Sequence, residues 1–280
     1  MKQSNNTIRL NNITIGGGSR IVLIAGPCVI EGRDITLRTA GRIKGITAKL
    51  NIPFIFKSSY KKANRTSGTS FAGLSMEKAL RILSEVKREC SIPILTDVHT
   101  EGEIDAVAEI ADVIQIPAFL CRQTELLQAA GRTKKIVNIK KGQFMAPEDM
   151  AHQAHKVEMT GNKKILLTER GASFGYHNLV VDMRSLVIMR SLGYPVILDA
   201  THSVQLPGGG KNVTGGQPEF IAPIARAGAA VGIDGLFVET HPNPAKAKSD
   251  AASQLKLDLL EQLLAQVIAI DTLVKEEYAA

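Results

Sequence analysis

The chain is expected to fold as an α/β protein, a (β/α)8 or TIM barrel that follows a short N-terminal β-hairpin. Eight short apolar runs rich in Val, Ile and Leu alternate with helical stretches in a chain of 280 residues. Such runs are typical of buried parallel strands, and eight strand-helix units in about 250 residues make this barrel. The carboxyl ends of the strands would then meet at one mouth, where barrel enzymes have their active sites.

Polar residues suited to chemistry stand at the end of every apolar run. In chain order the runs are IVLIA before Cys28, PFIF before Lys57, PILT before Asp97, VIQIPA around Gln115 and including Ala118, IVNIK before Lys141, ILLTE before Arg170, VILDATH with Asp199 and His202, and GLFVE ending at Glu239. Because strand ends converge, these residues are expected to be neighbours in space. The pattern therefore predicts an enzyme.

Apolar residues at three- and four-residue spacing predict the helices between the strands. The expected ranges are 36–50, 75–90, 101–110, 123–132, 146–160, 181–192, 219–232 and 254–277. Ser75 is a suitable N-cap for the second helix. Residues 1–20 hold two strand-like segments with a turn signal at Asn11 and Asn12, which predicts a hairpin that closes the barrel's N-terminal end.

Composition favours one barrel domain over residues 1–280 in a cytoplasmic enzyme. Hydrophobic residues make up 44% of the chain, enough for a large core. The polar N-terminus does not resemble a secretory signal, and no apolar run is long enough to span a bilayer. Three cysteines do not make a disulfide framework.

The net charge of +7 comes from 34 basic and 27 acidic residues. Most of the lysines and arginines are expected on a solvated surface, and no basic block interleaved with aromatics indicates nucleic-acid binding. A smaller group lies at strand ends: Lys57, Lys62, Arg65, Lys140, Lys141 and Arg170. Positive charge collected in a barrel mouth predicts a small anionic substrate that carries phosphate or carboxylate.

Four residues at the ends of the first, seventh and eighth strands form a mixed donor set. Cys28, His202, Glu239 and Asp250 can meet because the eighth strand lies between the other two in a closed barrel. Sulfur, nitrogen and oxygen donors together suit Zn²⁺ or Fe²⁺, with Mn²⁺ as a further candidate. The alternative is a buried hydrophobic cysteine and a hydrogen-bonded histidine, since the spacing matches no compact metal motif.

Two further groups suit anion binding. Adjacent lysines at a strand end point to opposite sides, so one of Lys140 and Lys141 is expected to face inward, and Lys141 is favoured. The segment Asn64-Arg65-Thr66-Ser67 joins a guanidinium with an amide and hydroxyls, which suits phosphate, although a polar turn is the alternative. Long loops at 58–74, 203–217 and 241–252 follow strands and are expected to be functional.

Several motifs resemble the 3-deoxy-D-manno-octulosonate 8-phosphate synthase family. They are IAGPCVIE, FKSSYKKANRTS, IQIPAFLCRQT, VNIKKGQF, LTERGASFGYHNLVVDMRS, DATHSVQLPGG and ETHPNPAKAKSDAASQL. The resemblance extends from about Ile21 to the C-terminal helix. It implies a (β/α)8 barrel, usually tetrameric, that condenses phosphoenolpyruvate with D-arabinose 5-phosphate and releases phosphate. The related 3-deoxy-heptulosonate-phosphate synthases, which use erythrose 4-phosphate, carry a KPRTS-like segment where this chain has KANRTS.

The resemblance also implies a metal. Family members that work without metal have Asn where this chain has Cys28, and commonly CDGPS where this chain has SDAAS around Asp250. This chain is therefore similar to the metal-dependent branch, with Zn, Fe or Mn held by Cys28, His202, Glu239 and Asp250.

Roles for the substrate-binding residues follow from the same resemblance. Lys62, Lys141 and Arg170 would hold phosphoenolpyruvate, with Lys57, Gln115, Ala118 and Phe119 lining its site. Asn64, Arg65 and Thr66 would hold the phosphate of arabinose 5-phosphate, on a loop, 58–74, that extends into a neighbouring subunit's site. Cys28, His202, Asp250 and Lys62 are the expected catalytic residues. Asp97 and Asp199 are expected to support them or to handle protons, with a structural role as the alternative. A non-catalytic sugar-phosphate sensor is disfavoured because no strand-end group is missing.

Overall fold

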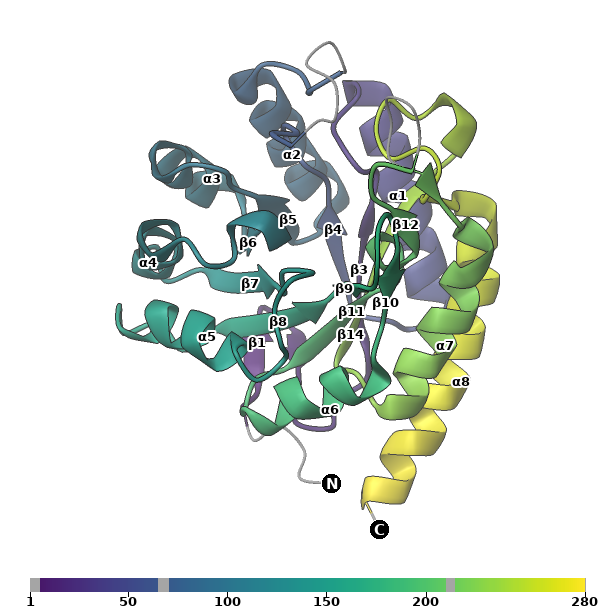
Figure 1. Cartoon of the computed structure of the whole chain (residues 1–280). Helices are drawn as coiled ribbons and strands as arrows, with labels where there is room; N and C mark the ends of the chain where they lie inside the picture. The colour runs from purple at the N-terminus through teal and green to yellow at the C-terminus, as the bar shows by residue number, and fades with distance from the viewer. Residues whose placement is uncertain (1–5, 65–70, 210–214, 280) are drawn as a thin grey trace.

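The predicted barrel is confirmed. The computed structural model describes residues 6–64, 71–209 and 215–279, and eight parallel strands of this part form the barrel (Figure 1). They are β3 (Val22–Gly26), β4 (Phe54–Lys57), β5 (Ile94–Asp97), β6 (Val113–Ile116), β7 (Ile136–Lys140), β8 (Ile165–Glu169), β11 (Val196–Asp199) and β14 (Gly235–His241). Neighbours pair in chain order, and β14 pairs with both β11 and β3, which closes the barrel.

Helices surround the strands, as Figure 1 shows. They are α1 (Arg33–Lys49), α2 (Met76–Cys90), α3 (Ile104–Ile110), α4 (Thr124–Arg132), α5 (Met150–Glu158), α6 (Met183–Ser191), α7 (Ile221–Val231) and α8 (Leu260–Ala279). The last helix begins six residues after the predicted start because Leu255–Lys256 form a short strand, β15, against β14. Ser75 is the N-cap of α2, but its side chain makes no capping hydrogen bond.

Two apolar cores hold the barrel together. The larger lies between strands and helices, and the smaller fills the barrel interior at the end where the strands begin. The predicted hairpin, β1 (Ile8–Leu10) and β2 (Ile13–Ile15), contributes Ile8, Ile13 and Ile15 to the interior core. It therefore plugs the N-terminal end of the barrel, and the polar groups of the interior lie toward the other end.

Two short hairpins lie at the other end of the barrel, where the strands end. Strands β9 (Ala172–Ser173) and β10 (Leu179–Val180) pair after β8, and β12 (Gln205–Leu206) pairs with β13 (Gly215–Gly216) after β11. Sequence patterns missed both hairpins because strands of two residues have no readable periodicity. Gly26 ends β3 where a Cβ would lie 2.0 Å from the Lys57 carbonyl oxygen, so only glycine permits this approach of β3 to β4.

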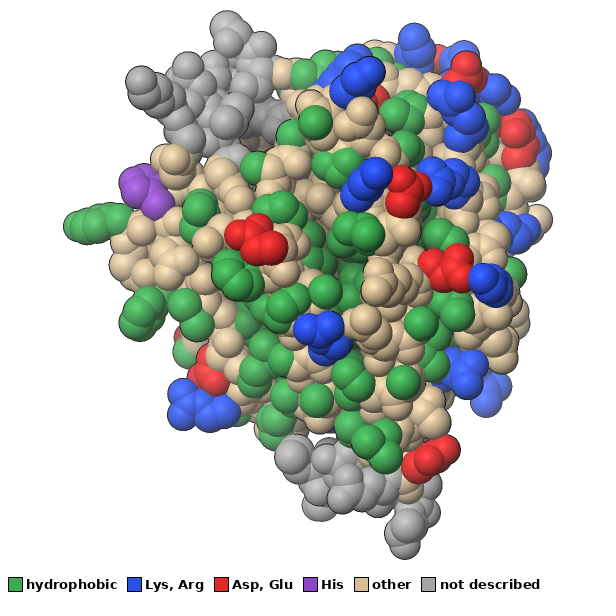
Figure 2. All heavy atoms as spheres, turned by 90° about the vertical axis from the view of Figure 1, so that its right-hand side faces the viewer, with side chains coloured by type: hydrophobic (Ala, Val, Ile, Leu, Met, Phe, Trp, Pro, Cys, Tyr) green, Lys and Arg blue, Asp and Glu red, His purple; other side chains and the backbone are tan. Residues whose placement is uncertain are grey.

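Exposed hydrophobic side chains lie on the side of the molecule over α7 and α8. Figure 2 shows hydrophobic side chains gathered in the centre of this face, with charged groups mostly toward its edges. Leu259 and Leu273, just before and within α8, are 50% and 69% exposed, and Phe220 before α7 is 46% exposed. Within the described residues, none of the helices combines the length and apolar character that a membrane span requires.

Candidate active site at the barrel mouth

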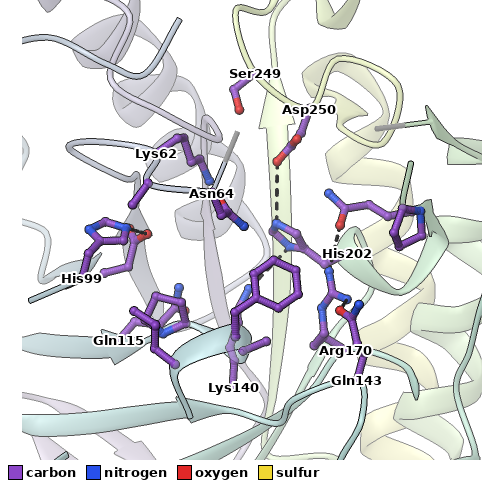
Figure 3. Close-up of a pocket in the computed structure, with 18 of the residues that line it drawn as sticks. Lys62, Asn64, His99, Gln115, Lys140, Gln143, Arg170, His202, Ser249 and Asp250 are labelled. Atoms are coloured by element: carbon purple, nitrogen blue, oxygen red, sulfur yellow. Dashed lines mark hydrogen bonds and ion pairs between the residues drawn. The ribbon is translucent and has the colours of Figure 1, made fainter. Parts of the chain in front are cut away.

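A cavity of about 480 Å³ opens where the barrel strands end. Figure 3 shows polar side chains from opposite sides of the barrel pointing into it. Predicted site residues that line it are Lys57, Lys62, Asn64, Gln115, Ala118, Phe119, Arg170, His202 and Asp250. Cys28 and Glu239, each 1% exposed, are buried next to it. Arg65 and Thr66 lie outside the described residues.

The predicted donor set converges at one side of this cavity. Ligand atoms of Cys28, Glu239 and Asp250 all lie within 4.8 Å of one another. The Cys28 sulfur is 3.2 Å from Asp250 Oδ2. His202 Nε2 lies 3.7 Å from Glu239 Oε1 and 3.9 Å from Asp250 Oδ2, so the imidazole faces the same group (Figure 3). Adjacent positions of β3, β14 and β11 in the barrel explain how residues so distant in sequence meet.

Asp199 orients the His202 imidazole. Its Oδ2 lies 2.7 Å from His202 Nδ1, and its Oδ1 accepts hydrogen bonds from Thr201 and from the His202 backbone. Burial and the nearby Lys140 charge lower the pKa of His202, which favours neutral imidazole. A proton on Nδ1 shared with Asp199 leaves the Nε2 lone pair directed at Glu239 and Asp250. This is the arrangement that carboxylate-supported metal ligands use.

The chemistry of the donor atoms fits a divalent transition metal. One sulfur, one imidazole nitrogen and two carboxylates make a four-ligand set of the kind Zn²⁺ and Fe²⁺ accept. Asp250 has a left-handed backbone with φ of 46°, a conformation that Asp adopts more readily than most residues other than glycine.

The Cys28 thiol must lose its proton before its sulfur can bind a metal. Burial, followed by the Asp250 and Glu239 charges, raises the pKa of the Cys28 thiol well above its ordinary value. The thiol contacts Ser249 Oγ at 2.9 Å. A metal would displace the thiol proton, so metal affinity is expected to fall at low pH.

Glu239 is held in its charged form by the lysines of the cavity. Lys57 Nζ donates to Glu239 Oε1 at 2.5 Å, and Lys62 Nζ lies 3.7 Å from the same oxygen. Burial alone would raise the pKa of Glu239, but Lys57, His202 and Lys62 together place it well below its ordinary value. The carboxylate therefore links the donor set to the cationic part of the cavity.

The orientation expected for the adjacent lysines is the reverse of the observed one. Lys140 lines the cavity and forms an ion pair with Asp199, and its Nζ lies 3.8 Å from the centre of the Phe237 ring. Lys141 is buried away from the cavity lining, with Nζ 3.4 Å from Glu169 and within 3.5 Å of the Gly142 and Met145 carbonyl oxygens. Asn138, two residues before Lys140, donates to Gln115 on the neighbouring strand β6, and Gln115 lines the cavity. Asn138 therefore points into the barrel, and strand alternation turns Lys140 to the same side.

Arg170 presents its guanidinium between two amide side chains. Its Nη1 donates to Gln143 Oε1 at 2.9 Å and its Nη2 to Gln205 Oε1 at 2.8 Å. Gln143 and Gln205 line the cavity, but sequence reasoning did not name them. Gln205 belongs to the segment 203–217, which the sequence predicts to be a functional loop, and this was the only sequence signal that pointed to it. A guanidinium fixed on both sides is well prepared to bind a carboxylate or phosphate.

Asp97 and His99 form another polar pair on the cavity wall, after β5. His99 Nε2 lies 3.2 Å from Asp97 Oδ2, and Asp97 Oδ1 has no hydrogen-bond partner in the described part of the chain. Burial alone would raise the pKa of Asp97, but His99, Lys57 and Lys62 outweigh this and lower it. Asp97 is therefore charged and able to accept a further hydrogen bond. His99 was not named from the sequence, although it stands two residues after Asp97.

The loop at 58–74 is anchored at its base by its own chain. Ser59 forms an isolated β-bridge with Val29, and Lys61 forms one with Gly73. The Lys62 backbone N donates to Ala72 O at 2.7 Å. These contacts fix Lys62 at the cavity edge. The part of the loop that carries Arg65 and Thr66 lies outside the described residues.

Comparison with known proteins assigns the family. The sequence model described as the DAHP synthetase I family matches residues 2–276. The chain belongs to the DAHP synthetase I family. Its relatives in this family include proteins named 2-dehydro-3-deoxyphosphooctonate aldolase from Syntrophotalea carbinolica, 52% identical over 96% of this chain and 97% of the relative, and from Acidithiobacillus ferrooxidans, 55% identical over 96% of both. A protein of that name from Geobacter sulfurreducens is 53% identical over 96% of this chain and 98% of its own length.

Proposed function

We propose that the chain condenses phosphoenolpyruvate with D-arabinose 5-phosphate and water to give 3-deoxy-D-manno-octulosonate 8-phosphate and phosphate, a step of lipopolysaccharide biosynthesis. The observation that carries this proposal is the cationic cavity at the barrel mouth. Four basic residues line it: Arg170, Lys57, Lys62 and Lys140. The names of the relatives support the octulosonate product over the heptulosonate alternative.

The cationic groups provide two kinds of recognition. Arg170, held by Gln143 and Gln205, would bind the carboxylate or phosphate of phosphoenolpyruvate, and Lys140 takes the place that the sequence reasoning gave to Lys141. Charged hydrogen bonds of this kind contribute about 1.5–3 kcal/mol each. Asn64 stands at the cavity edge and, with Arg65 and Thr66, is proposed to bind the sugar phosphate.

The reaction makes a C–C bond and a C–O bond to water, and it breaks the C–O bond to phosphate. The aldehyde oxygen takes up a proton, and the attacking water gives one up. C3 of phosphoenolpyruvate attacks the aldehyde carbon, water adds at C2, and the resulting tetrahedral intermediate expels phosphate. The lysines and Arg170 would stabilise the departing phosphate by charge. Asp97 lines the cavity, and its carboxylate is proposed to accept a hydrogen bond from a hydroxyl or a water there.

Cys28, His202, Glu239 and Asp250 are proposed to hold a Zn, Fe or Mn ion. The mixed donor atoms and the oriented His202 imidazole support this. When bound, such a metal would supply Lewis-acid polarisation and would lower the pKa of a bound water. Asp199 would keep the imidazole in the ligating tautomer.

The enzyme is further proposed to act in the cytoplasm as a homotetramer, with loop 58–74 extending into a neighbouring site. The apolar face over α7 and α8 supports an assembly, because exposed apolar surfaces of this kind mark interaction sites (Figure 2). A mixing test addresses the loop. Arg65→Ala and Cys28→Ala proteins, dissociated and reassociated, should regain activity if sites are shared, and no regain in confirmed mixed oligomers would contradict sharing.

One experiment tests the proposed function and the metal together. Phosphate release from phosphoenolpyruvate is measured with arabinose 5-phosphate and with erythrose 4-phosphate, before and after treatment with dipicolinate. We expect turnover with the five-carbon sugar, its loss on chelation and its recovery with a divalent transition metal. Turnover with erythrose 4-phosphate alone would assign the heptulosonate reaction, and full activity in verified metal-free protein would exclude the metal.

A further inference from the structure

Glu103 lies behind the wall of the cavity and bonds to two of the loops that form it. It belongs to the short 3-10 helix η1 (Glu101–Glu103) that precedes α3. Its Oε2 accepts hydrogen bonds from the Tyr60 hydroxyl at 2.5 Å, from His99 N at 2.9 Å and from Thr100 N at 3.2 Å. Its Oε1 accepts from Lys61 Nζ at 2.6 Å. One carboxylate thus joins the loop after β4 to the loop after β5.

Both loops carry cavity residues directly beside these contacts. Tyr60 and Lys61 precede Lys62 and Asn64, which line the cavity, and His99 lines it with its own ring (Figure 3). A shift of the Glu103 carboxylate would therefore move cavity groups of both loops. Glu103 itself does not line the cavity.

Tyr60 adds a second link between the loops. Its side chain is fully buried, and its ring packs edge-on against His99 with centres 5.7 Å apart. Its hydroxyl oxygen lies 3.4 Å from His99 Nδ1, while the other ring nitrogen of His99 faces Asp97. The His99 ring is therefore held between Asp97 on one side and the Tyr60–Glu103 pair on the other.

The charge states of Glu103 and Tyr60 determine which group donates and which accepts. Burial raises the pKa of the Glu103 carboxyl, but Lys61, Tyr60 and the His99 amide outweigh it and lower the pKa to about 2. Burial and the contact with Glu103 raise the pKa of Tyr60. At neutral pH the carboxylate accepts and the hydroxyl donates. The Lys61 ion pair, with the lysine side chain 40% exposed, is the weakest of these links.

We propose that Glu103, through Tyr60 and the His99 backbone, is a positioning residue that holds the β4 and β5 loops in register for substrate binding. The inference rests on the proposed function for its assay. It assigns Glu103 no contact with substrate. Misplacing reacting groups by about 1 Å can cost about a hundredfold in rate, so a residue outside the cavity can have a large effect.

The test compares Glu103→Gln with Asp112→Asn. Asp112 is a matched control because it also accepts from a lysine, Lys87 Nζ at 2.7 Å, and from a backbone amide, Ile94 N at 2.9 Å. Lys87 and Asp112 side chains are 38% and 15% exposed, close to the 40% and 12% of Lys61 and Glu103. Ile94 begins β5, at the opposite end from His99.

Thermal unfolding, kcat and both KM values are measured for each variant, together with phosphoenolpyruvate affinity at equilibrium. We expect similar thermal destabilisation in both variants, but a fall in kcat/KM of about tenfold or more, with a raised KM, in Glu103→Gln alone. A smaller folded fraction would lower kcat and leave KM unchanged. Tyr60→Phe, which removes one hydroxyl, should show a milder loss of the same kind and keeps the test valid if Glu103→Gln does not fold.

Two results would overturn the inference. One is a kcat/KM in Glu103→Gln within about threefold of wild type. If Glu103→Gln does not fold, the corresponding result is a kcat/KM and KM in Tyr60→Phe equal to those of wild type. The other is an equal loss in Asp112→Asn, which would show a general structural effect. Failure of the wild-type protein to release phosphate from phosphoenolpyruvate with either sugar phosphate would instead refute the proposed function, so the two failures are distinct.

Discussion

Replacing Asp199 by Asn removes one charge from the buried centre of the site and keeps its shape. Asp199 is fully buried and pairs with both Lys140 and His202 Nδ1. An amide nitrogen at the Oδ2 position would leave the Lys140 charge unpaired. It would also favour the other His202 tautomer, with a proton on Nε2, where the lone pair now faces Glu239 and Asp250.

The expected cost to stability follows from the lost ion pair. Removing one partner of a buried pair destabilises a protein by about 3–5 kcal/mol. Burial lowers the pKa of Lys140, so this lysine can lose its proton, and we expect a cost at the lower end of the range, about 3 kcal/mol. At about 2–4 °C per kcal/mol, the melting temperature should fall by roughly 6–12 °C. Loss of the ligand-orienting carboxylate should lower metal affinity by about 10–100-fold.

Calorimetry and metal titration measure the two effects. The double variant Lys140→Met with Asp199→Asn separates them, because it removes the unpaired lysine charge. We expect it to recover most of the lost melting temperature and none of the lost metal affinity. A melting temperature of Asp199→Asn within about 2 °C of wild type would refute the stability argument. Unchanged metal affinity would refute the role given to Asp199 in orienting His202.

Three further outcomes are expected. Cys28→Asn should lose metal affinity while some metal-free turnover survives, and metal binding as tight as in wild type would show that Cys28 is not a ligand. Arg170→Lys should raise the KM for phosphoenolpyruvate about tenfold, since lysine cannot make the paired contacts of the planar guanidinium, and steady-state kinetics will check this. The pKa of Glu103 is lowered from 4.5 to about 2, so its stabilising contribution is complete above pH 4.5 and is lost as the pH falls toward 2; acid unfolding of Glu103→Gln should lack this component.

The sequence by itself determined the barrel and the types of residue at its mouth. Periodicity is a local property, so the strands, most helix positions and the N-terminal hairpin were predictable. Closure of the barrel then placed Cys28, His202, Glu239 and Asp250 near one another, because strand order follows from the fold. Short strands and loop conformations were missed, since β15 depends on pairing with β14 and not on its own two residues.

Only the tertiary structure decided which side chains face the cavity and what holds them. Asn138 bonds Gln115 on the neighbouring strand β6 at the inner face of the barrel, and Lys140, two residues later, lines the cavity where Lys141 does not. The hydrogen-bond partners of Arg170, Gln143 and Gln205, follow different barrel strands, so no spacing in the sequence predicts them. Glu103 likewise contacts Tyr60 from 43 residues away. Hydrogen-bond partners distant in sequence depend on how loops pack over the barrel end, and that packing is decided by the whole fold.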